Sequence, residues 1–229
     1  MKIYLELEDI NKLEDAADFL RDKILIRLLY FLACRISAIL AIAVNDIEFK
    51  QRTIIVKHLK ERIKLSCPHC NTRLSKTNKY CPGCSRKISK VIKEKFEQHR
   101  RRILPVDRKT LAMLKEYIDR GGPVNRDGRL LLFDINRHRA WQIIKQCAIK
   151  AGLPRLINPE TGKEHYISPH RLRDAFAIHA VKQNDSGDGL RMLQEHLGHA
   201  SISTTMRYRK VAGEEHQQWY DKLWQKEDT

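Results

Sequence analysis

The stretch that decides the fold is residues 167–208, which begins ISPHRLRDAFAIHAV and ends LQEHLGHASISTTMRY. His170 and Arg173 stand three residues apart in a helix-like run, so both are expected on one face of a helix, about one turn apart. His199 follows a Leu-Gly turn, and Tyr208 comes nine residues later at the end of a short helical segment. These side chains offer a nucleophile, a proton carrier and an anion clamp within one short span.

The pattern HxLR followed by LGHxSxxTTxxY resembles the tyrosine site-specific recombinases, the phage integrase and Xer-type family. Upstream, YFLACRISAILAI at residues 30–42 resembles their first arginine box, with Arg35 at the matching position. The resemblance runs from about Arg21 to Tyr208 in the family's order. It implies a mainly α-helical catalytic domain with a small antiparallel β-sheet, an α+β fold, in a site-specific recombinase or integrase.

The resemblance also implies a task for each matching side chain. Arg35 and Arg173 are expected to hold the nonbridging phosphate oxygens, because guanidinium is planar and stays charged. Tyr208 is expected to attack phosphorus and form a 3′-phosphotyrosine, with His170 as the candidate base. His199 is expected to donate a hydrogen bond to a nonbridging oxygen or to hold the tyrosine segment.

A lysine in the turn after the second strand is the general acid in the resembling family. In this chain a cysteine-rich segment interrupts that turn. Lys60, in HLKER, is the first choice, and Lys57 and Lys64 are its competitors. The covalent intermediate would conserve the bond energy, so the resemblance implies that catalysis needs neither ATP nor a metal ion.

Two features depart from the family pattern. The family usually has a carboxylate three residues after its first arginine, whereas this chain has Ala38, which is expected to loosen Arg35 or reduce the rate. Only about twenty residues precede the matching region, where relatives usually carry a helical DNA-clamping domain. Three explanations remain open: a minimal recombinase, a fragment, or a cysteine-rich segment that supplies part of the grip.

Two other activities also remain open. A type IB topoisomerase-like enzyme would use the same chemistry to relax DNA without exchanging strands. A DNA-binding regulator would keep the fold and lack turnover, and Ala38 is the one hint of it.

The cysteine-rich segment is SCPHCNTRLSKTNKYCPGCSRK, residues 66–87, and it contains two CxxC pairs: Cys67 with Cys70, and Cys81 with Cys84. Four thiolates at this spacing suit a tetrahedral zinc ion. Two disulfides or empty thiols are the alternatives, and a reducing compartment disfavours disulfides. Because protein sulfur would fill all four coordination positions, we expect structural Zn²⁺ and no catalytic cofactor.

β-like runs in residues 44–59 and a strand candidate at residues 100–107 flank this zinc ribbon. Such strands belong together in the resembling family, so the resemblance implies that the ribbon interrupts a β-hairpin. The predicted organisation is a catalytic domain in two parts, residues 1–65 and 89–229, around a ribbon at residues 66–88. Its second part would end in a C-terminal tail helix.

Apolar spacing predicts the other helices. They are expected at residues 22–33, 108–120 and 138–151, after a first helix capped by Asp9.

The charge of the chain indicates a polyanionic partner. Among its 229 residues, 44 Lys and Arg against 28 Asp and Glu give a formal net charge of +16, which suits double-stranded DNA. A homotetramer on DNA is implied by the resemblance alone.

The membrane-length apolar run at residues 24–44 contains Arg27 and Arg35, each costing about 2.5–3.5 kcal/mol at a bilayer centre. We therefore expect buried helices and no membrane span. MKIYLELEDINKLED has acidic residues where a signal peptide needs an apolar core. The expected location is the cytoplasm, in association with the nucleoid.

Overall fold

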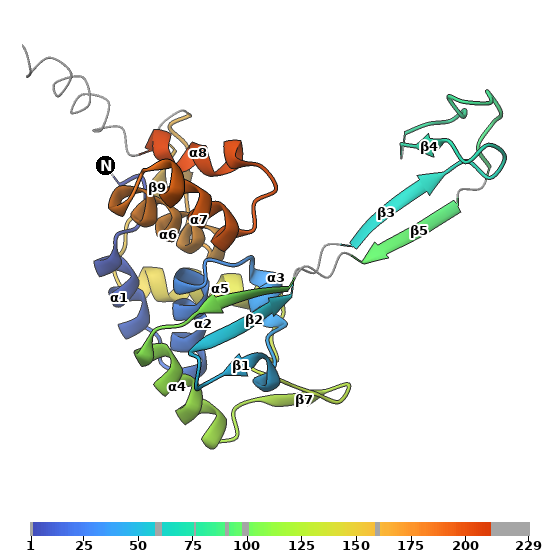
Figure 1. The fold of residues 1–229 in the computed structure, drawn as a ribbon. Helices are drawn as coiled ribbons and strands as arrows, with labels where there is room; N and C mark the ends of the chain where they lie inside the picture. Colours follow the sequence, from blue (N-terminus) through green and yellow to red (C-terminus); the bar gives the residue numbers. More distant parts are fainter. Residues whose placement is uncertain are drawn as a thin grey trace, which may run out of the picture. The chain divides into compact units, whose positions relative to one another are not determined.

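The structure is a computed structural model that describes residues 2–57, 61–75, 77–89, 92–97, 101–158 and 161–211 (Figure 1). It divides into two compact units. Unit 1 comprises Met1–Val56 and Arg102–Thr229, and unit 2 comprises Lys57–Arg101. The predicted ribbon at residues 66–88 lies inside unit 2, which starts earlier and ends later in the chain.

Unit 1 is mainly α-helical, as predicted. Its described helices are α1 (Leu7–Asp15), α2 (Leu20–Phe31), α3 (Ile36–Leu40), α4 (Arg108–Asp119), α5 (Arg137–Lys150), α6 (Pro169–Gln183), α7 (Gly187–Leu197) and α8 (Ile202–Val211). The three helices predicted from apolar spacing are confirmed to within two residues at each end. The predicted tail helix falls in residues 212–229, outside the described part of the chain.

Helix α2 is the centre of the unit 1 core. It packs against α1, α4 and α6, and Ile24, Leu25, Leu28 and Leu29 are completely buried. An apolar helix of this kind is stable only where neighbours cover it from several directions. Within the described residues, each helix is too short or too polar to cross a lipid bilayer.

The predicted cap of α1 is wrong in detail. The N-cap residue is Glu6, and Asp9 is the third residue of the helix. The Asp9 carboxylate instead accepts the backbone N–H of Glu6 at 2.8 Å. A carboxylate in the first turn satisfies an otherwise unpaired donor and also favours the positive end of the helix dipole.

A three-stranded sheet in the order β1-β2-β6 accompanies the helices of unit 1 (Figure 1). Strand β1 (Ile47–Glu48) pairs antiparallel with β2 (Thr53–Lys57), and β6 (Arg101–Pro105) lies beside β2. Since β2 and β6 are neighbours, unit 2 is an insertion between two paired strands, as the sequence predicts.

The remaining short elements of unit 1 connect its helices. They are the 3₁₀ helix η1 (Val44–Asp46), the hairpin of β7 (Val124–Arg126) and β8 (Arg129–Leu131), and the pair β9 (Leu156–Ile157) and β10 (Glu164–His165).

Unit 2 contains a second antiparallel sheet in the order β4-β3-β5. Its strands are β3 (Glu61–Ser66), β4 (Arg73–Leu74) and β5 (Ile92–Glu97). Among the side chains of unit 2 that the structure describes, the buried core consists of Cys67, Leu74 and Cys81. A core in which two of the three described members are cysteines suits a unit held together by a metal ion or another cross-link.

Candidate active site and cysteine cluster

Arg173 joins three segments of unit 1 that are distant in the sequence. It lies in α6 with 2% of its surface exposed. Its guanidinium donates to the carbonyl of Ala33 and, at 2.8 Å, to the carbonyl of Leu197. It also donates to His199 Nε2 at 2.9 Å. These bonds use three of the five N–H donors of the group and bring the ends of α2 and α7 to one point.

The end of α2 places the first arginine beside this point. Ala33 adopts a φ of 46°, a left-handed conformation that is uncommon for a residue with a Cβ, and its carbonyl faces Arg173. Arg35 follows two residues later as the N-cap of α3, and it is exposed. Its positive charge is close enough to lower the pKa of His199. Ala38, in α3, is buried and offers no carboxylate to Arg35.

His199 is held in one tautomer. Guanidinium has no acceptor, so the Nε2 atom that receives the Arg173 bond must be unprotonated. The Nδ1–H then donates to Thr205 Oγ1 at 3.0 Å, which ties His199 to α8. Burial, followed by the charges of Arg173 and Arg35, lowers the pKa of His199 to about 4. The imidazole is therefore neutral at physiological pH.

A left-handed glycine makes this placement possible. Gly198 ends α7 with a φ of 66°, and the chain turns there so that the next residue faces Arg173. A Cβ at this position would also lie 3.0 Å from the Arg102 guanidinium carbon. Glycine avoids both penalties.

Tyr208 lies on α8 beside His199, with ring centroids 6.2 Å apart and nearly parallel planes. Its hydroxyl donates to Asp174 Oδ1 at 3.0 Å. Burial, followed by the negative charge of Asp174 and this hydrogen bond, raises the pKa of Tyr208 to about 12. Tyr208 is therefore a neutral phenol at rest, and attack requires removal of its proton.

His170 is one turn before Arg173 on α6, yet its side chain is 73% exposed. Its Nε2 lies 3.8 Å from Asp174 Oδ1, the oxygen that accepts the tyrosine hydroxyl. An adjoining pocket of about 550 Å³ is lined by His170, Asp174, Trp141 and Tyr166, among others. Asp174 is the residue that sequence reasoning missed. The available signal was a carboxylate four residues after His170, on the same face of the helix.

The candidate lysines are less closely defined by the structure. Lys60 lies outside the described residues. Lys57 is the last residue of β2, and Lys64 lies in β3 of unit 2 with Glu94 as its cross-strand partner. The described site therefore brings together Arg35, Arg173, His199 and Tyr208, with His170 at its rim.

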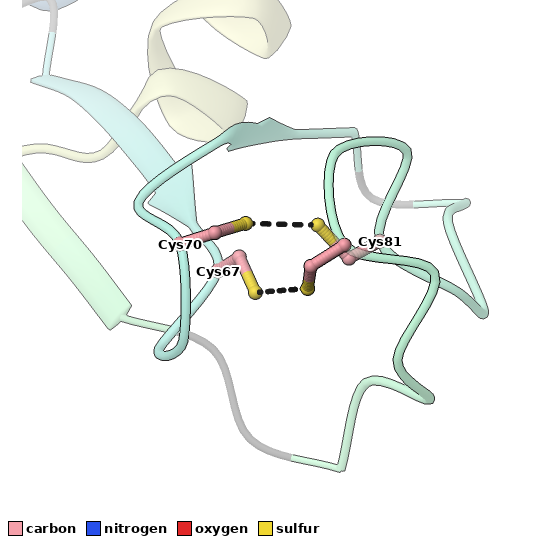
Figure 2. Close-up of side chains that lie close together, drawn as sticks. Cys67, Cys70 and Cys81 are labelled. Atoms are coloured by element: carbon pink, nitrogen blue, oxygen red, sulfur yellow. Dashed lines mark hydrogen bonds between the residues drawn. The ribbon is translucent and has the colours of Figure 1, made fainter.

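The four cysteines of unit 2 form a cluster. Figure 2 shows Cys67, Cys70 and Cys81 with their sulfurs turned toward one another. The ligand atoms of these three and of Cys84 all lie within 4.8 Å. The Cys67–Cys84 and Cys70–Cys81 sulfur separations are 3.7 and 3.4 Å. A disulfide requires about 2.05 Å, whereas a tetrahedral zinc with Zn–S bonds of about 2.3 Å separates its sulfurs by about 3.8 Å.

Each CxxC pair lies on the same kind of tight turn. The amide of Asn71 donates to the Cys67 carbonyl at 3.0 Å, and the amide of Ser85 donates to the Cys81 carbonyl at 2.9 Å. Both Asn71 and Ser85 have positive φ, at 56° and 55°. The two turns therefore present their cysteines equivalently. The cluster fits a metal ion.

The arrangement of helices, sheet and site residues defines a tyrosine recombinase catalytic domain. The chain belongs to the phage integrase family, which matches residues 4–215, so the resemblance stated from the sequence is confirmed.

Among its relatives, tyrosine recombinase XerA of Pyrococcus horikoshii is 26% identical over 204 residues, covering 89% of this chain and 55% of that protein. Tyrosine recombinase XerD of Mycobacterium tuberculosis is 35% identical over 121 residues, covering 49% of this chain and 35% of that protein. The chain spans about half the length of the first curated relatives it matches.

Solved structures share the fold. The XerH site-specific recombinase bound to palindromic difH substrate, in a post-cleavage complex, matches with a TM-score of 0.61 at 18% identity. That match covers 95% of this chain and 52% of the XerH chain. The crystal structure of XerA recombinase matches with a TM-score of 0.60 at 20% identity, over 91% of this chain and 60% of that one.

Proposed function

We propose that this protein is a site-specific DNA recombinase or integrase that cuts and rejoins double-stranded DNA through Tyr208. The observation that carries the proposal is the convergence of Arg173, His199 and Tyr208 from three helical segments, with Arg35 beside them, in a chain of the phage integrase family. A phenol beside fixed guanidinium groups is the arrangement that attack on an anionic phosphodiester requires.

In the proposed reaction the Tyr208 oxygen attacks phosphorus and the bond to the 5′ oxygen breaks. The product is a 3′-phosphotyrosine and a free 5′-hydroxyl, and the reverse reaction rejoins the strand. Arg35 and Arg173 stabilise the charge on the nonbridging oxygens, and His170 is the candidate base that takes the Tyr208 proton. His199 orients Arg173 and the tyrosine helix, and Lys60, with Lys57 and Lys64 as alternatives, protonates the leaving oxygen.

We assign double-stranded DNA as the partner, because the chain has a formal charge of +16 and its structural neighbours include a recombinase in complex with its DNA substrate. By the same resemblance we propose a homotetramer acting on two duplexes. A cytoplasmic, nucleoid-associated location follows from the proposed substrate.

We further propose that Cys67, Cys70, Cys81 and Cys84 hold one structural Zn²⁺ ion. The sulfur separations and the paired turns support this assignment. Four protein thiolates leave no open position for a substrate, so zinc would stabilise unit 2 and take no part in strand cleavage. Catalysis would use protein side chains alone.

A covalent-trapping experiment tests the function. The protein is incubated, without ATP or divalent metal, with nicked duplexes cut from the DNA that flanks its gene, and SDS-resistant adducts are counted. The proposal predicts adducts for the wild type and none for Tyr208→Phe. Strand exchange between two duplexes supports a recombinase. Relaxation of supercoils without exchange would instead establish a topoisomerase-like enzyme, and DNA binding without any adduct would establish a regulator.

A further inference from the structure

The tyrosine hydroxyl is hydrogen-bonded to a carboxylate that the proposed mechanism does not use. Asp174 Oδ1 accepts the Tyr208 hydroxyl at 3.0 Å. The same oxygen lies 3.8 Å from His170 Nε2, and Asp174 Oδ2 lies 3.5 Å from Arg171 Nη1. The Asp174 side chain is only 16% exposed. The carboxylate is therefore in direct contact with the reacting oxygen, which also interacts with Arg173.

The negative charge of Asp174 is unfavourable at this position for two reasons. The site must receive an anionic phosphodiester, and Asp174 would repel that charge. Its charge also opposes formation of a free phenolate on Tyr208. Both penalties disappear if the proton moves onto the carboxylate during attack. Asp174 then becomes neutral at the moment when charge develops on the phosphate.

We propose that Asp174 is the general base that accepts the Tyr208 proton during attack. This inference rests on the proposed function and adds a residue to it. The Tyr208 O–H bond breaks and its proton goes to Asp174 Oδ1, while the O–P bond forms and the P–O5′ bond breaks. The leaving oxygen takes its proton from the general acid lysine. In rejoining, the Asp174 carboxylic acid returns the proton to the tyrosine oxygen.

The geometry favours Asp174 over His170 as the direct acceptor. The Tyr208 hydroxyl already donates to Asp174 Oδ1 at 3.0 Å, whereas the His170 side chain is 73% exposed and its Nε2 lies 3.8 Å from that same Asp174 oxygen. A positioned base must lie within about 2.6–3.2 Å of the proton donor. His170, which is largely exposed, is placed to pass the proton between Asp174 and water.

The test compares single-turnover cleavage by Asp174→Asn, Asp174→Glu and the wild type on a duplex that forms the Tyr208 adduct. The asparagine side chain has the same shape and accepts no proton, so cleavage is expected to slow about 10²- to 10⁴-fold. The glutamate variant is expected to recover part of the loss. Asp185→Asn is the matched control, because Asp185 is an exposed carboxylate that pairs with Arg209 on the tyrosine helix, and it should cleave at the wild-type rate.

Two further measurements distinguish a general base at Asp174 from a residue that only makes a structural contact. The Asn defect should shrink as the pH rises, since hydroxide then removes the proton. The charged and titratable groups around this pair are His170 and Arg171 beside Asp174, and Arg173 and His199 beside Tyr208. Added formate should accelerate Asp174→Ala, because it supplies a free carboxylate. Thermal unfolding verifies that each variant is folded.

Cleavage by Asp174→Asn at or above the wild-type rate would overturn the assignment and make Asp174 a latch that restrains the tyrosine. A slow Asn variant with no pH or formate response would reduce Asp174 to a structural contact. Failure of the wild type to form an adduct would overturn the proposed function itself, a result distinct from both.

Discussion

Arg173 stabilises the fold in addition to its proposed catalytic role. Its guanidinium satisfies the buried carbonyls of Ala33 and Leu197 and the imidazole of His199 at once. A lysine ammonium is a point charge on a flexible stem and cannot reproduce this planar fork. The substitution would therefore leave buried acceptors without donors.

We predict that Arg173→Lys lowers the free energy of unfolding by about 1–3 kcal/mol, the cost of an unsatisfied buried polar group, and abolishes adduct formation. Urea denaturation and covalent trapping measure the two effects. Arg191→Lys, at an exposed position on α7, is the control and should change neither. Wild-type stability in Arg173→Lys would contradict the structural role.

The general acid is open among three lysines, and a modified substrate can identify it. A 5′-bridging sulfur leaves as a thiolate and needs no proton. We assign Lys60 first as the general acid. Lys60→Ala is then expected to cleave ordinary DNA slowly and to cleave the sulfur substrate at about the wild-type rate. The Asp174→Asn variant should stay slow on both substrates, because it lacks the base. Rescue of Lys57→Ala or Lys64→Ala in place of Lys60→Ala would move the assignment.

At the residue scale the sequence predicted a set of site residues, and the structure brings Arg35, Arg173, His199 and Tyr208 together; their chemical roles stay predictions. Arg35, Arg173, His199 and Tyr208 stand in an ordered pattern that a single chain displays. Asp174 was missed because its role depends on the approach of α8 to α6, which no local spacing encodes. The left-handed Ala33 was equally hidden, since alanine gives no sign of a positive φ.

At the scale of elements, a buried ion network joins α2 to α1 and α4. Arg27 donates to Glu14 and to Asp107, each at 2.7 Å, and to Thr110 at 2.8 Å. Its guanidinium also lies over the Phe31 ring. Arg27 and Glu14 are almost completely buried, so removing Arg27 takes away the buried partner of Glu14 and leaves the carboxylate with its ion pair to Lys109 at 2.8 Å.

We predict that Arg27→Met lowers the free energy of unfolding by about 3–5 kcal/mol, measured by urea denaturation. Arg21→Met, which removes a more exposed pair with Asp22 on the same helix, should cost about 1 kcal/mol or less. Adding Glu14→Gln to Arg27→Met should recover part of the lost free energy of unfolding, since Glu14 then no longer places a negative charge where Arg27 is missing. Equal costs for the two arginines would contradict the network.

The same network sets an acid response. Burial alone would raise the pKa of Glu14, but hydrogen bonds from Lys109 and Arg27 outweigh it and hold the pKa below its ordinary value. A depressed pKa stabilises the fold fully above the unfolded value of about 4.3, and that stability is lost as pH falls through the folded value. In Arg27→Met the loss should begin at a higher pH.

The helices predicted at residues 22–33, 108–120 and 138–151 followed the apolar spacing closely because burial dominates their placement. The predicted cap of α1 was wrong. Asp9 lies in the first turn of the helix and accepts a backbone N–H that has no partner within the helix. An N-cap residue, which lies just before the helix, accepts the same kind of N–H, so the sequence pattern does not distinguish the two positions.

At the scale of the whole molecule, the protein is a helical catalytic unit interrupted between β2 and β6 by a small cysteine-centred unit. The two units differ in the cores that the structure describes. Unit 1 has a large apolar core, whereas the described core of unit 2 consists of Cys67, Cys81 and Leu74. The cysteines predicted the insertion from the sequence. The bounds of the insertion depend on strand pairing between residues on either side of it, which the sequence pattern does not display.

We predict that zinc removal by a strong chelator exposes the turn amides of Asn71 and Ser85 to hydrogen exchange and leaves the core of unit 1 protected. Cys70→Ser should have the same effect and should abolish bound zinc in native mass spectrometry. Cys147→Ser, in α5 of unit 1, is the control and should retain one zinc per chain. Full protection of unit 2 after complete zinc loss would contradict a structural metal.

The central claim is that the Tyr208 oxygen becomes bonded to the 3′ phosphate of a cut DNA strand. The most direct measurement is mass spectrometry of the trapped adduct after digestion with nuclease and protease. The account predicts a nucleotide attached through its 3′ phosphate to the tyrosine of the peptide that contains Tyr208. A nucleotide on any other residue, or a 5′-phosphate linkage, would contradict it.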